Sequence, residues 1–440
     1  MNALPTAAGR LRVPLTIDAR RVVAGFALAG TFASGFLIAA GVAGEPSSFV
    51  PARKGGYPGW LHEPLSSLHA GLAMNEVVLV FGAMWAFYGV AMWLSDVVTP
   101  RQAIGAIVGL HVVFFLGPPL LSTDVFNYIE YGRLGALHGL NPYTHGPSAV
   151  PGDAAYAFVG WRDATSVYGP GFTLGAYATA PLGVGGALWA LKASAALASL
   201  ACVALVWRAA ELLGRRPLEA AMFFGLNPLL LVYAVGGAHN DLLMLALALG
   251  GIVFFLEGRE RASGLAATGA LAVKASTGLL LPYLLLAARS RARLAAGALV
   301  AAAATALLWI VAFDGAIVPF LETLRWEQQH GSLHSVPKAL GSLAGIPVGD
   351  PGLRLAGQLL FAGALGFTLW RARRTGDWLT WAGWGTLALL VTTAWLLPWY
   401  VIWLLPIAAM TGNRGLRVAS LALCAFVIGM RVPLWLDGIG

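Results

Sequence analysis

The sequence predicts an all-α polytopic membrane protein, a bundle of about 11 to 13 spans of which some are short or broken. Only 11% of the 440 residues are charged and 58% are hydrophobic, with a mean hydropathy of +0.74, too little polar surface for a water-soluble domain. Apolar runs of roughly 18 to 25 residues recur, each long enough to cross the hydrocarbon as a helix, whereas barrel strands would alternate over about 10 residues. We expect residues 1–440 to form one membrane domain.

The first apolar run, the net charge and the cysteines narrow the class of protein further. Arg10, Arg12, Arg20 and Arg21 precede the first apolar run, residues 22–43, which is longer than a cleaved signal sequence requires and is expected to be a retained anchor. The net charge of +8 comes from arginines scattered in short turns, which indicates membrane topology and not nucleic-acid binding. Cys202 and Cys424 lie inside apolar runs and are expected to be packing residues.

Orientation follows from the basic clusters, because Arg and Lys gather in cytoplasmic loops. These clusters fall on one side if the spans lie near 22–43, 72–95, 103–121, 186–212, 218–235, 239–256, 294–313, 353–371, 378–397, 399–411 and 416–432. The opposite, extracytoplasmic face then receives the long loops 44–71, 122–185 and 314–352. The last two hold most of the His, Asp, Trp and Tyr residues outside the spans, so the chemistry is expected there.

Residues 263–288 do not fit a single crossing, because basic clusters assigned to the same side flank them. We expect a hairpin of two short half-helices with Lys274 near its tip, since broken helices occur at membrane depth where they line a cavity.

The segment 122–133 places an acid, two tyrosines and an arginine directly after an apolar run. Asp124, Tyr128 and Tyr131 are spaced to share one face of a helix lying along the membrane surface. Two interpretations stand at this point. In the first, Asp124 complements a helix N-terminus and the tyrosines anchor at the membrane interface. In the second, these residues form a functional site, as ionisable residues beside hydrocarbon commonly do.

Further motifs favour the second interpretation. Asp-x3-Tyr-x2-Tyr-Gly-Arg at 124–133 is followed by Gly-x-Asn-Pro-Tyr at 139–143 and by Tyr-Gly-Pro at 168–170. Ala-His-Asn-Asp at 238–241, Val-Lys at 273–274, Ser-Val-Pro at 335–337 and Trp-Leu-Leu-Pro-Trp-Tyr at 395–400 come later. In order and spacing the chain resembles the GT-C superfamily of membrane glycosyltransferases, and within it the polyprenol-phosphomannose-dependent α-1,6-mannosyltransferases of actinobacteria. The resemblance covers about residues 100 to 411 and assigns no role to residues 1–100.

The resemblance implies an inverting transfer of mannose from polyprenyl-phosphate-mannose to a hydroxyl of a lipid-linked or polysaccharide mannan, with Asp124 as the catalytic base. A single carboxylate suits inversion, because retention by double displacement needs a second one as nucleophile. The candidate substrate-binding residues are Tyr128, Tyr131, Arg133, Asn141, Tyr143, Tyr168, His239, Asn240, Asp241, Lys274, His334, Lys338 and Trp399.

No cofactor or metal is expected. A monophosphate leaving group can be neutralised by fixed cations, for which the candidates are Arg133, Lys274, Arg325, His334 and Lys338. His239 and Asp241, two positions apart, give only a weak metal pattern, and capping of a span by Asn240 or Asp241 is an alternative to substrate contact. Lys274 could equally snorkel to the interface, and Trp399 could be an interface anchor.

The predicted partners are a polyprenyl-phosphate-sugar donor, a glycan or glycolipid acceptor and membrane lipids, with no nucleic acid. We expect a multi-pass protein of the cell membrane with its active site on the extracytoplasmic side. Two alternatives remain: a GT-C enzyme that uses arabinofuranose, glucose or aminoarabinose, and a lipid or sugar transporter. Transporters usually show internal pseudo-symmetry, which this sequence lacks.

Overall fold

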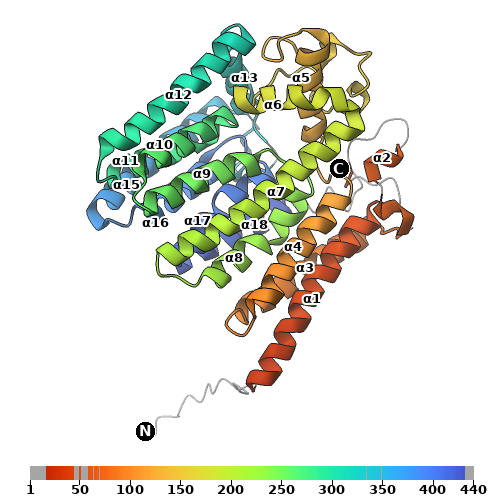
Figure 1. The fold of residues 1–440 in the computed structure, drawn as a ribbon, viewed down its shortest axis with the longest axis vertical. Helices are drawn as coiled ribbons and strands as arrows, with labels where there is room; N and C mark the ends of the chain where they lie inside the picture. The colour runs from red at the N-terminus through yellow and green to blue at the C-terminus, as the bar shows by residue number, and fades with distance from the viewer. Residues whose placement is uncertain are drawn as a thin grey trace.

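A computed structural model describes residues 16–43, 49–50, 58–62, 64–68, 70–332, 334–347 and 349–431. Arg10, Arg12 and half of the predicted loop 44–71 lie outside the described residues. Within them all regular structure is helical, which confirms the predicted class (Figure 1). The helices are α1 Ile17–Gly41, α2 Gly59–His62, α3 Met74–Trp93, α4 Pro100–Leu116, α5 Asp124–His138, α6 Pro170–Thr179, α7 Gly183–Leu212, α8 Pro217–Gly225, α9 Asp241–Leu256, α10 Glu260–Gly269, α11 Leu280–Ala287, α12 Arg291–Phe313, α13 Ile317–His330, α14 Val336–Leu343, α15 Pro351–Thr375, α16 Trp378–Thr392, α17 Leu405–Thr411 and α18 Arg414–Gly429.

Among the described residues, five segments are long and apolar enough to cross a membrane: Ile17–Gly41, Met74–Trp93, Pro170–Leu212, Arg291–Phe313 and Pro351–Thr375. Shorter apolar helices supplement them. The predicted span 103–121 ends at Leu116, since Gly117, Pro118 and Pro119 cannot continue a helix. The predicted span 218–235 is divided by Asn227-Pro228 into α8 and a wider π-helical turn, Leu230–Val235.

Small residues let α10 and α12 approach closely. A Cβ added at Gly264 would lie 2.0 Å from the carbonyl oxygen of Leu294, and one added at Gly297 would lie 1.9 Å from that of Arg261. Lipid provides little hydrophobic driving force between helices, so such close backbone packing does much to hold membrane bundles together. Alanine at Gly264 or Gly297 would therefore separate the two helices.

The predicted hairpin is present, and α10 leads into it. The chain leaves helical geometry at Lys274, whose backbone is extended, and returns through a short 3₁₀ turn, Ala275–Leu279, to α11. The side chain of Glu260 at the start of α10 accepts hydrogen bonds from the backbone N–H groups of Arg289 and Ser290 after α11. Both ends of the hairpin therefore meet on one side of the bundle, and Lys274 lies near its tip.

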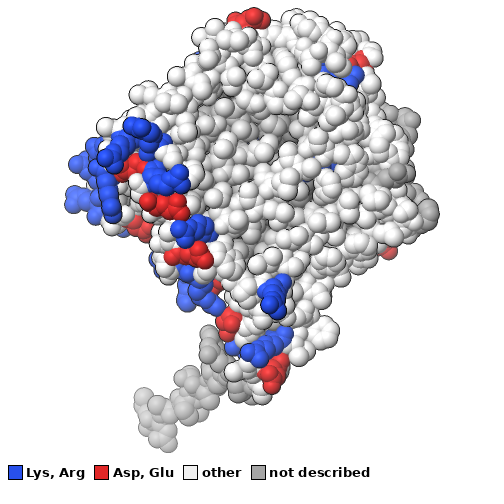
Figure 2. Space-filling model, viewed as in Figure 1, with Lys and Arg blue, Asp and Glu red and all other residues white. Residues whose placement is uncertain are grey.

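Charged side chains gather at one end of the molecule. Figure 2 shows Lys, Arg, Asp and Glu along one edge of the visible face, where the ends of several long helices come together, while the broad surface between the two ends carries almost none. The ion pairs Arg20–Asp96 and Arg208–Glu257 join neighbouring turns there. The helices α5, α6 and α13 lie at the other end (Figure 1).

Candidate active site

A cavity opens at the end of the bundle that holds α5 and α13. Including its mouth, which is open to solvent, it encloses about 910 Å³ of space between atoms. Its walls come from the start of α5, the loop 161–168, the hairpin tip 274–276, the second half of α13 and the segment 395–403. Five stretches that are distant in the sequence therefore converge on one space.

Asp124 is the first residue of α5 and lines this cavity. Its backbone N–H donates to the Ser122 hydroxyl at 3.1 Å, and its Oδ1 accepts from the Trp161 indole N–H at 3.4 Å. The Nδ1 atom of His239 lies 3.5 Å from the other carboxylate oxygen. Only 9% of the residue is exposed, and burial raises the pKa of Asp124 to about 6, against a smaller opposing effect of Lys274. A carboxylate in this state is suited to accept a proton near neutral pH.

Lys274 reaches the same cavity from the hairpin tip. Its ammonium lies 2.9 and 3.0 Å from the two carboxylate oxygens of Asp241, and 4.4 Å from the centre of the Tyr400 ring. The side chain of Asp241 is fully buried at the start of α9 and also accepts from the Trp403 indole N–H at 2.8 Å. Since an ammonium has three donors, one N–H remains for a ligand in the cavity.

Tyr131 and Tyr168 also line the cavity, as the predicted face of α5 and the Tyr-Gly-Pro motif suggested. Tyr131 donates to the carbonyl oxygen of Ala164 at 2.8 Å and thereby ties α5 to the loop. Tyr128 lies one layer behind, where its hydroxyl donates to Asn240 at 3.4 Å and its ring packs edge-on against Tyr168.

His239 and Asn240 are buried behind the wall and do not line the cavity. The His239 ring stacks on Trp399 with centroids 3.8 Å apart, so Trp399 is a packing partner and not an interface anchor. Asn240 precedes α9 without a capping hydrogen bond from its side chain. These residues position Asp124 and Tyr128 from behind.

Two other predicted binding residues hold the outer loop in place. Asn141 donates to the carbonyl oxygen of Phe313 at the end of α12 and accepts from the backbone N–H of Tyr143. Tyr143 donates to the carbonyl oxygen of Tyr168 at 2.8 Å, and its ring packs among Trp309, Phe313 and Phe320. The Gly-x-Asn-Pro-Tyr motif therefore joins the loop to α12 and α13.

Most of the candidate cations lie away from the cavity. Arg133 faces Asp153, with contacts of 2.7 and 3.0 Å, and His138 binds the same carboxylate. Arg325 is exposed on α13, His334 is buried elsewhere, and Lys338 lines a separate small hollow beside α14. Lys274 alone of the predicted cations lines the cavity in the described part of the chain.

Sequence reasoning missed several cavity residues. Trp161, Trp403 and Glu327 line the cavity and were not among the predicted site residues. Burial raises the pKa of Glu327 to about 7, and the charge of Asp124 across the cavity adds to this increase. Trp395 and Trp403 line the cavity, so the concentration of aromatic residues in 395–403 was a usable signal for the last wall.

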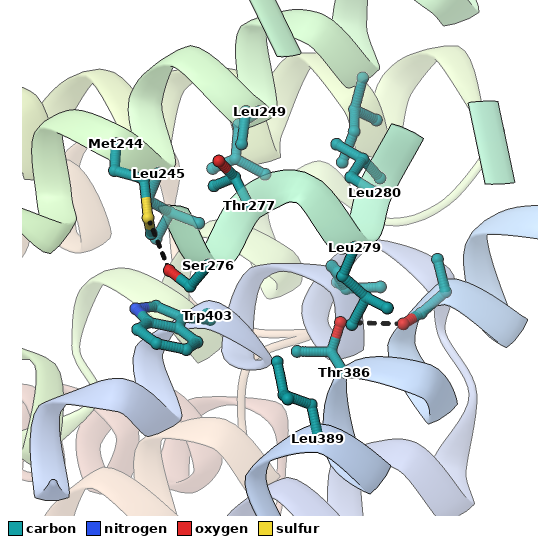
Figure 3. Close-up of a pocket in the computed structure, with 14 residues that line it drawn as sticks. Met244, Leu245, Leu249, Ser276, Thr277, Leu279, Leu280, Thr386, Leu389 and Trp403 are labelled. Carbon is teal, nitrogen blue, oxygen red and sulfur yellow. Dashed lines mark hydrogen bonds between the residues drawn. The ribbon is translucent and has the colours of Figure 1, made fainter. Parts of the chain in front are cut away.

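An apolar groove continues from the cavity along the hairpin (Figure 3). Ser276 and Trp403 line both spaces. Leucine, alanine, methionine and isoleucine side chains from α9, α11, α16 and α17 supply most of the remaining wall. Its hydroxyls have acceptors within the protein: Ser276 donates to Met244 Sδ, and Thr386 to the carbonyl oxygen of Ala382. The groove is therefore suited to a hydrocarbon chain.

In the described part of the chain, no three His, Cys, Asp or Glu side chains are grouped so as to hold a metal ion. The free cysteines Cys202 and Cys424 are both buried, as expected of packing residues.

Comparison with known proteins places these residues in a family. A family model described as alpha-(1->6)-mannopyranosyltransferase, N-terminal domain, matches residues 27–290, and one described as MptB C-terminal domain matches residues 351–434. Alpha-(1->6)-mannopyranosyltransferase A of Mycobacterium tuberculosis is 31% identical over 415 residues, which cover 82% of this chain and 77% of that protein.

Two proteins of Corynebacterium glutamicum match over shorter stretches. Alpha-(1->6)-mannopyranosyltransferase A is 28% identical over 39% of this chain and 36% of its own length, and alpha-(1->6)-mannopyranosyltransferase B is 29% identical over 37% and 27%. No solved structure matches this chain. The resemblance read from the motifs is confirmed: the chain belongs to the alpha-(1->6)-mannopyranosyltransferase family and is a membrane mannosyltransferase.

Proposed function

We propose that this protein transfers mannose from polyprenyl-phosphate-mannose to a hydroxyl of a mannan acceptor at the extracytoplasmic face of the cell membrane, forming an α-1,6 linkage. One observation carries the proposal: a buried carboxylate and a partly buried ammonium face one cavity that continues into an apolar groove. The carboxylate suits the acceptor hydroxyl, the ammonium suits a phosphate, and the groove suits a polyprenyl chain.

The proposed transfer needs a base, an acceptor hydroxyl and a phosphate leaving group. The acceptor oxygen attacks the anomeric carbon of mannose while its proton passes to the Asp124 carboxylate. The bond from that carbon to the phosphate oxygen breaks, and polyprenyl phosphate leaves with the electron pair. Because one displacement inverts the carbon, an α product requires a β-linked donor.

Lys274 is the residue proposed to stabilise the phosphate as its negative charge grows. The ammonium is held by Asp241 and flanked by the Tyr400 ring, so it needs little reorganisation when the leaving group develops charge. Two residues after Lys274, Ser276 lines the apolar groove. The headgroup and the hydrocarbon chain of one lipid would therefore contact neighbouring parts of the hairpin. We propose that this arrangement works without a metal ion.

Purified protein with polyprenyl-phosphate-mannose and an α-1,6-linked mannoside acceptor tests the proposal. We expect a lengthened mannoside whose new anomeric signal in NMR spectra is α. Faster transfer from the glucose, arabinofuranose or aminoarabinose donor would reassign the sugar. Labelled lipid that crosses proteoliposomes without a new glycosidic bond would instead favour the transporter.

The orientation can be tested by labelling with a membrane-impermeant maleimide, since both native cysteines are buried. Leu343 in α14 is 87% exposed near the cavity end, and Arg373 is exposed at the charged end of α15. Basic residues mark the cytoplasmic side, so Leu343→Cys is expected to react in intact cells and Arg373→Cys only after permeabilisation. The reverse pattern would place the cavity in the cytoplasm.

The pH dependence of turnover follows from the base. Asp124 accepts a proton only when ionised, and its pKa is about 6, so kcat/KM is expected to rise with pH through about 6 and then to level. Glu327→Gln is expected to leave the rise near pH 6, because burial raises the pKa of Glu327 to about 7 and its side chain is largely uncharged at that pH. A profile that is flat below pH 6 would rule out Asp124 as the base.

A further inference from the structure

A second hollow opens beside the reaction cavity toward the outside of the molecule. Including its wide mouth it encloses about 1290 Å³, and its walls are the loop residues 143–144 and 160–165 on one side and α13 on the other. Arg162, Asp163 and Glu322 line this outer cleft and not the reaction cavity. The catalytic steps proposed above leave it without a role.

The outer cleft and the reaction cavity share part of their walls. Trp161, Ala164, Thr165, Thr323 and Trp326 line both. At this boundary the hydroxyl oxygens of Thr165 and Thr323 lie 2.5 Å apart and join the loop to α13. Trp161 also donates to Asp124, so one indole contacts the proposed base and borders the outer cleft. The outer cleft and the reaction cavity therefore adjoin at Trp161, next to Asp124.

The lining of the outer cleft selects a ligand class. Trp161 and Trp326 are 40% and 42% exposed and offer flat apolar faces, while threonine hydroxyls and carboxylates offer hydrogen bonds. One arginine stands against two acids, and Arg162 already lies over the Tyr156 ring at 4.7 Å. A phosphate would meet net negative charge here, and a lipid chain would meet polar walls, unlike those of the groove in Figure 3.

We propose that the outer cleft binds the acceptor glycan as an extended, neutral oligosaccharide, so that several sugars behind the reacting hydroxyl are recognised. This inference rests on the proposed function. The donor lipid then enters from the apolar groove and the acceptor from the outer cleft, and the two meet at Asp124 and Lys274. The apolar sugar faces pack on Trp326, while Asp163 and Glu322 accept hydrogen bonds from hydroxyls.

Kinetics with α-1,6-linked mannosides of one to four sugars test this inference. In the unaltered protein the acceptor KM is expected to fall as the chain lengthens. Asp163→Ala with Glu322→Ala is expected to raise the KM of the longest acceptor roughly tenfold while the donor KM stays within about twofold, because these residues line the outer cleft alone. Trp326→Ala is expected to do the same to the acceptor KM.

The matched control for Trp326 is Trp93→Ala at the end of α3. It removes a 70% exposed indole that lines neither hollow, so both KM values are expected to stay unchanged. Each acceptor is used free and as its octyl glycoside. An equal length dependence in both forms means that the cleft reads the glycan itself, whereas a dependence that appears only with the octyl group would overturn the inference in favour of a lipid-anchored site.

Binding without donor separates this inference from the proposed function. Saturation-transfer NMR with α-1,6-mannotriose is expected to show binding that the Asp163/Glu322 double variant loses, even if polyprenyl-phosphate-mannose proves to be the wrong donor. Wild-type acceptor KM values at every length in the cleft variants, together with unchanged mannotriose binding, would overturn the inference while leaving the donor assignment intact.

Discussion

Asp124→Asn is expected to reduce turnover by about 10² to 10⁴ while the protein remains folded. Asparagine keeps the size of the side chain and an oxygen that can accept from the Trp161 indole, but it cannot take the proton of the acceptor hydroxyl. Burial disfavours the ionised form of Asp124, so the neutral amide is not expected to lower the melting temperature. Initial rates at saturating donor, with a melting curve for the same sample, check both parts.

Glu130→Gln is the matched control for Asp124→Asn. Glu130 is buried on the same helix and does not line the cavity. Burial and the neighbouring Asp153 raise the pKa of Glu130 to about 8, so it is mostly protonated at pH 7 and glutamine resembles it. Full activity is expected in this control. Turnover that survives in Asp124→Asn would mean that another group takes the proton, with Glu327 the next carboxylate in the cavity.

Lys274→Met is expected to destabilise the protein by about 3–5 kcal/mol, because it leaves Asp241 buried without its countercharge. The carboxylate of Asp241 would keep only the Trp403 indole as a donor within the contacts described. A lower melting temperature in detergent measures this loss. Asp241→Asn is expected to cost less, since Lys274 is 12% exposed and can turn toward the cavity.

The double variant Lys274→Met with Asp241→Asn separates stability from chemistry. Removing both charges relieves the uncompensated carboxylate, so most of the lost stability is expected to return. Turnover is expected to stay reduced by about 10² to 10³, the loss typical of one missing donor to a developing anion. Wild-type turnover in the double variant would show that Lys274 only pairs with Asp241.

The broad architecture could be predicted from the sequence, because a lipid environment constrains the length and polarity of each segment. Apolar length identified the long spans, and Gly117-Pro118-Pro119 explains where one of them stops early. Basic clusters on both sides of residues 263–288 required a hairpin, which the structure confirms with its break at Lys274. The spacing of Asp124, Tyr128 and Tyr131 placed them on one face of a helix, since helical periodicity depends only on neighbouring residues.

The composition of the candidate site required the tertiary structure. Packing between separate parts of the chain decides which charged groups pair. It brings Lys274 to Asp241 and Arg133 to Asp153, and it places Glu327 and Asp124 in one cavity. Trp161 and Trp403 line the cavity for the same reason.

What this sequence determined by itself was therefore its helical membrane class, its hairpin and the acid at the head of α5. Which cation faces that acid, and which hollows lead to it, only the folded chain decided, because a buried charge takes whichever partner packing brings within a few ångströms.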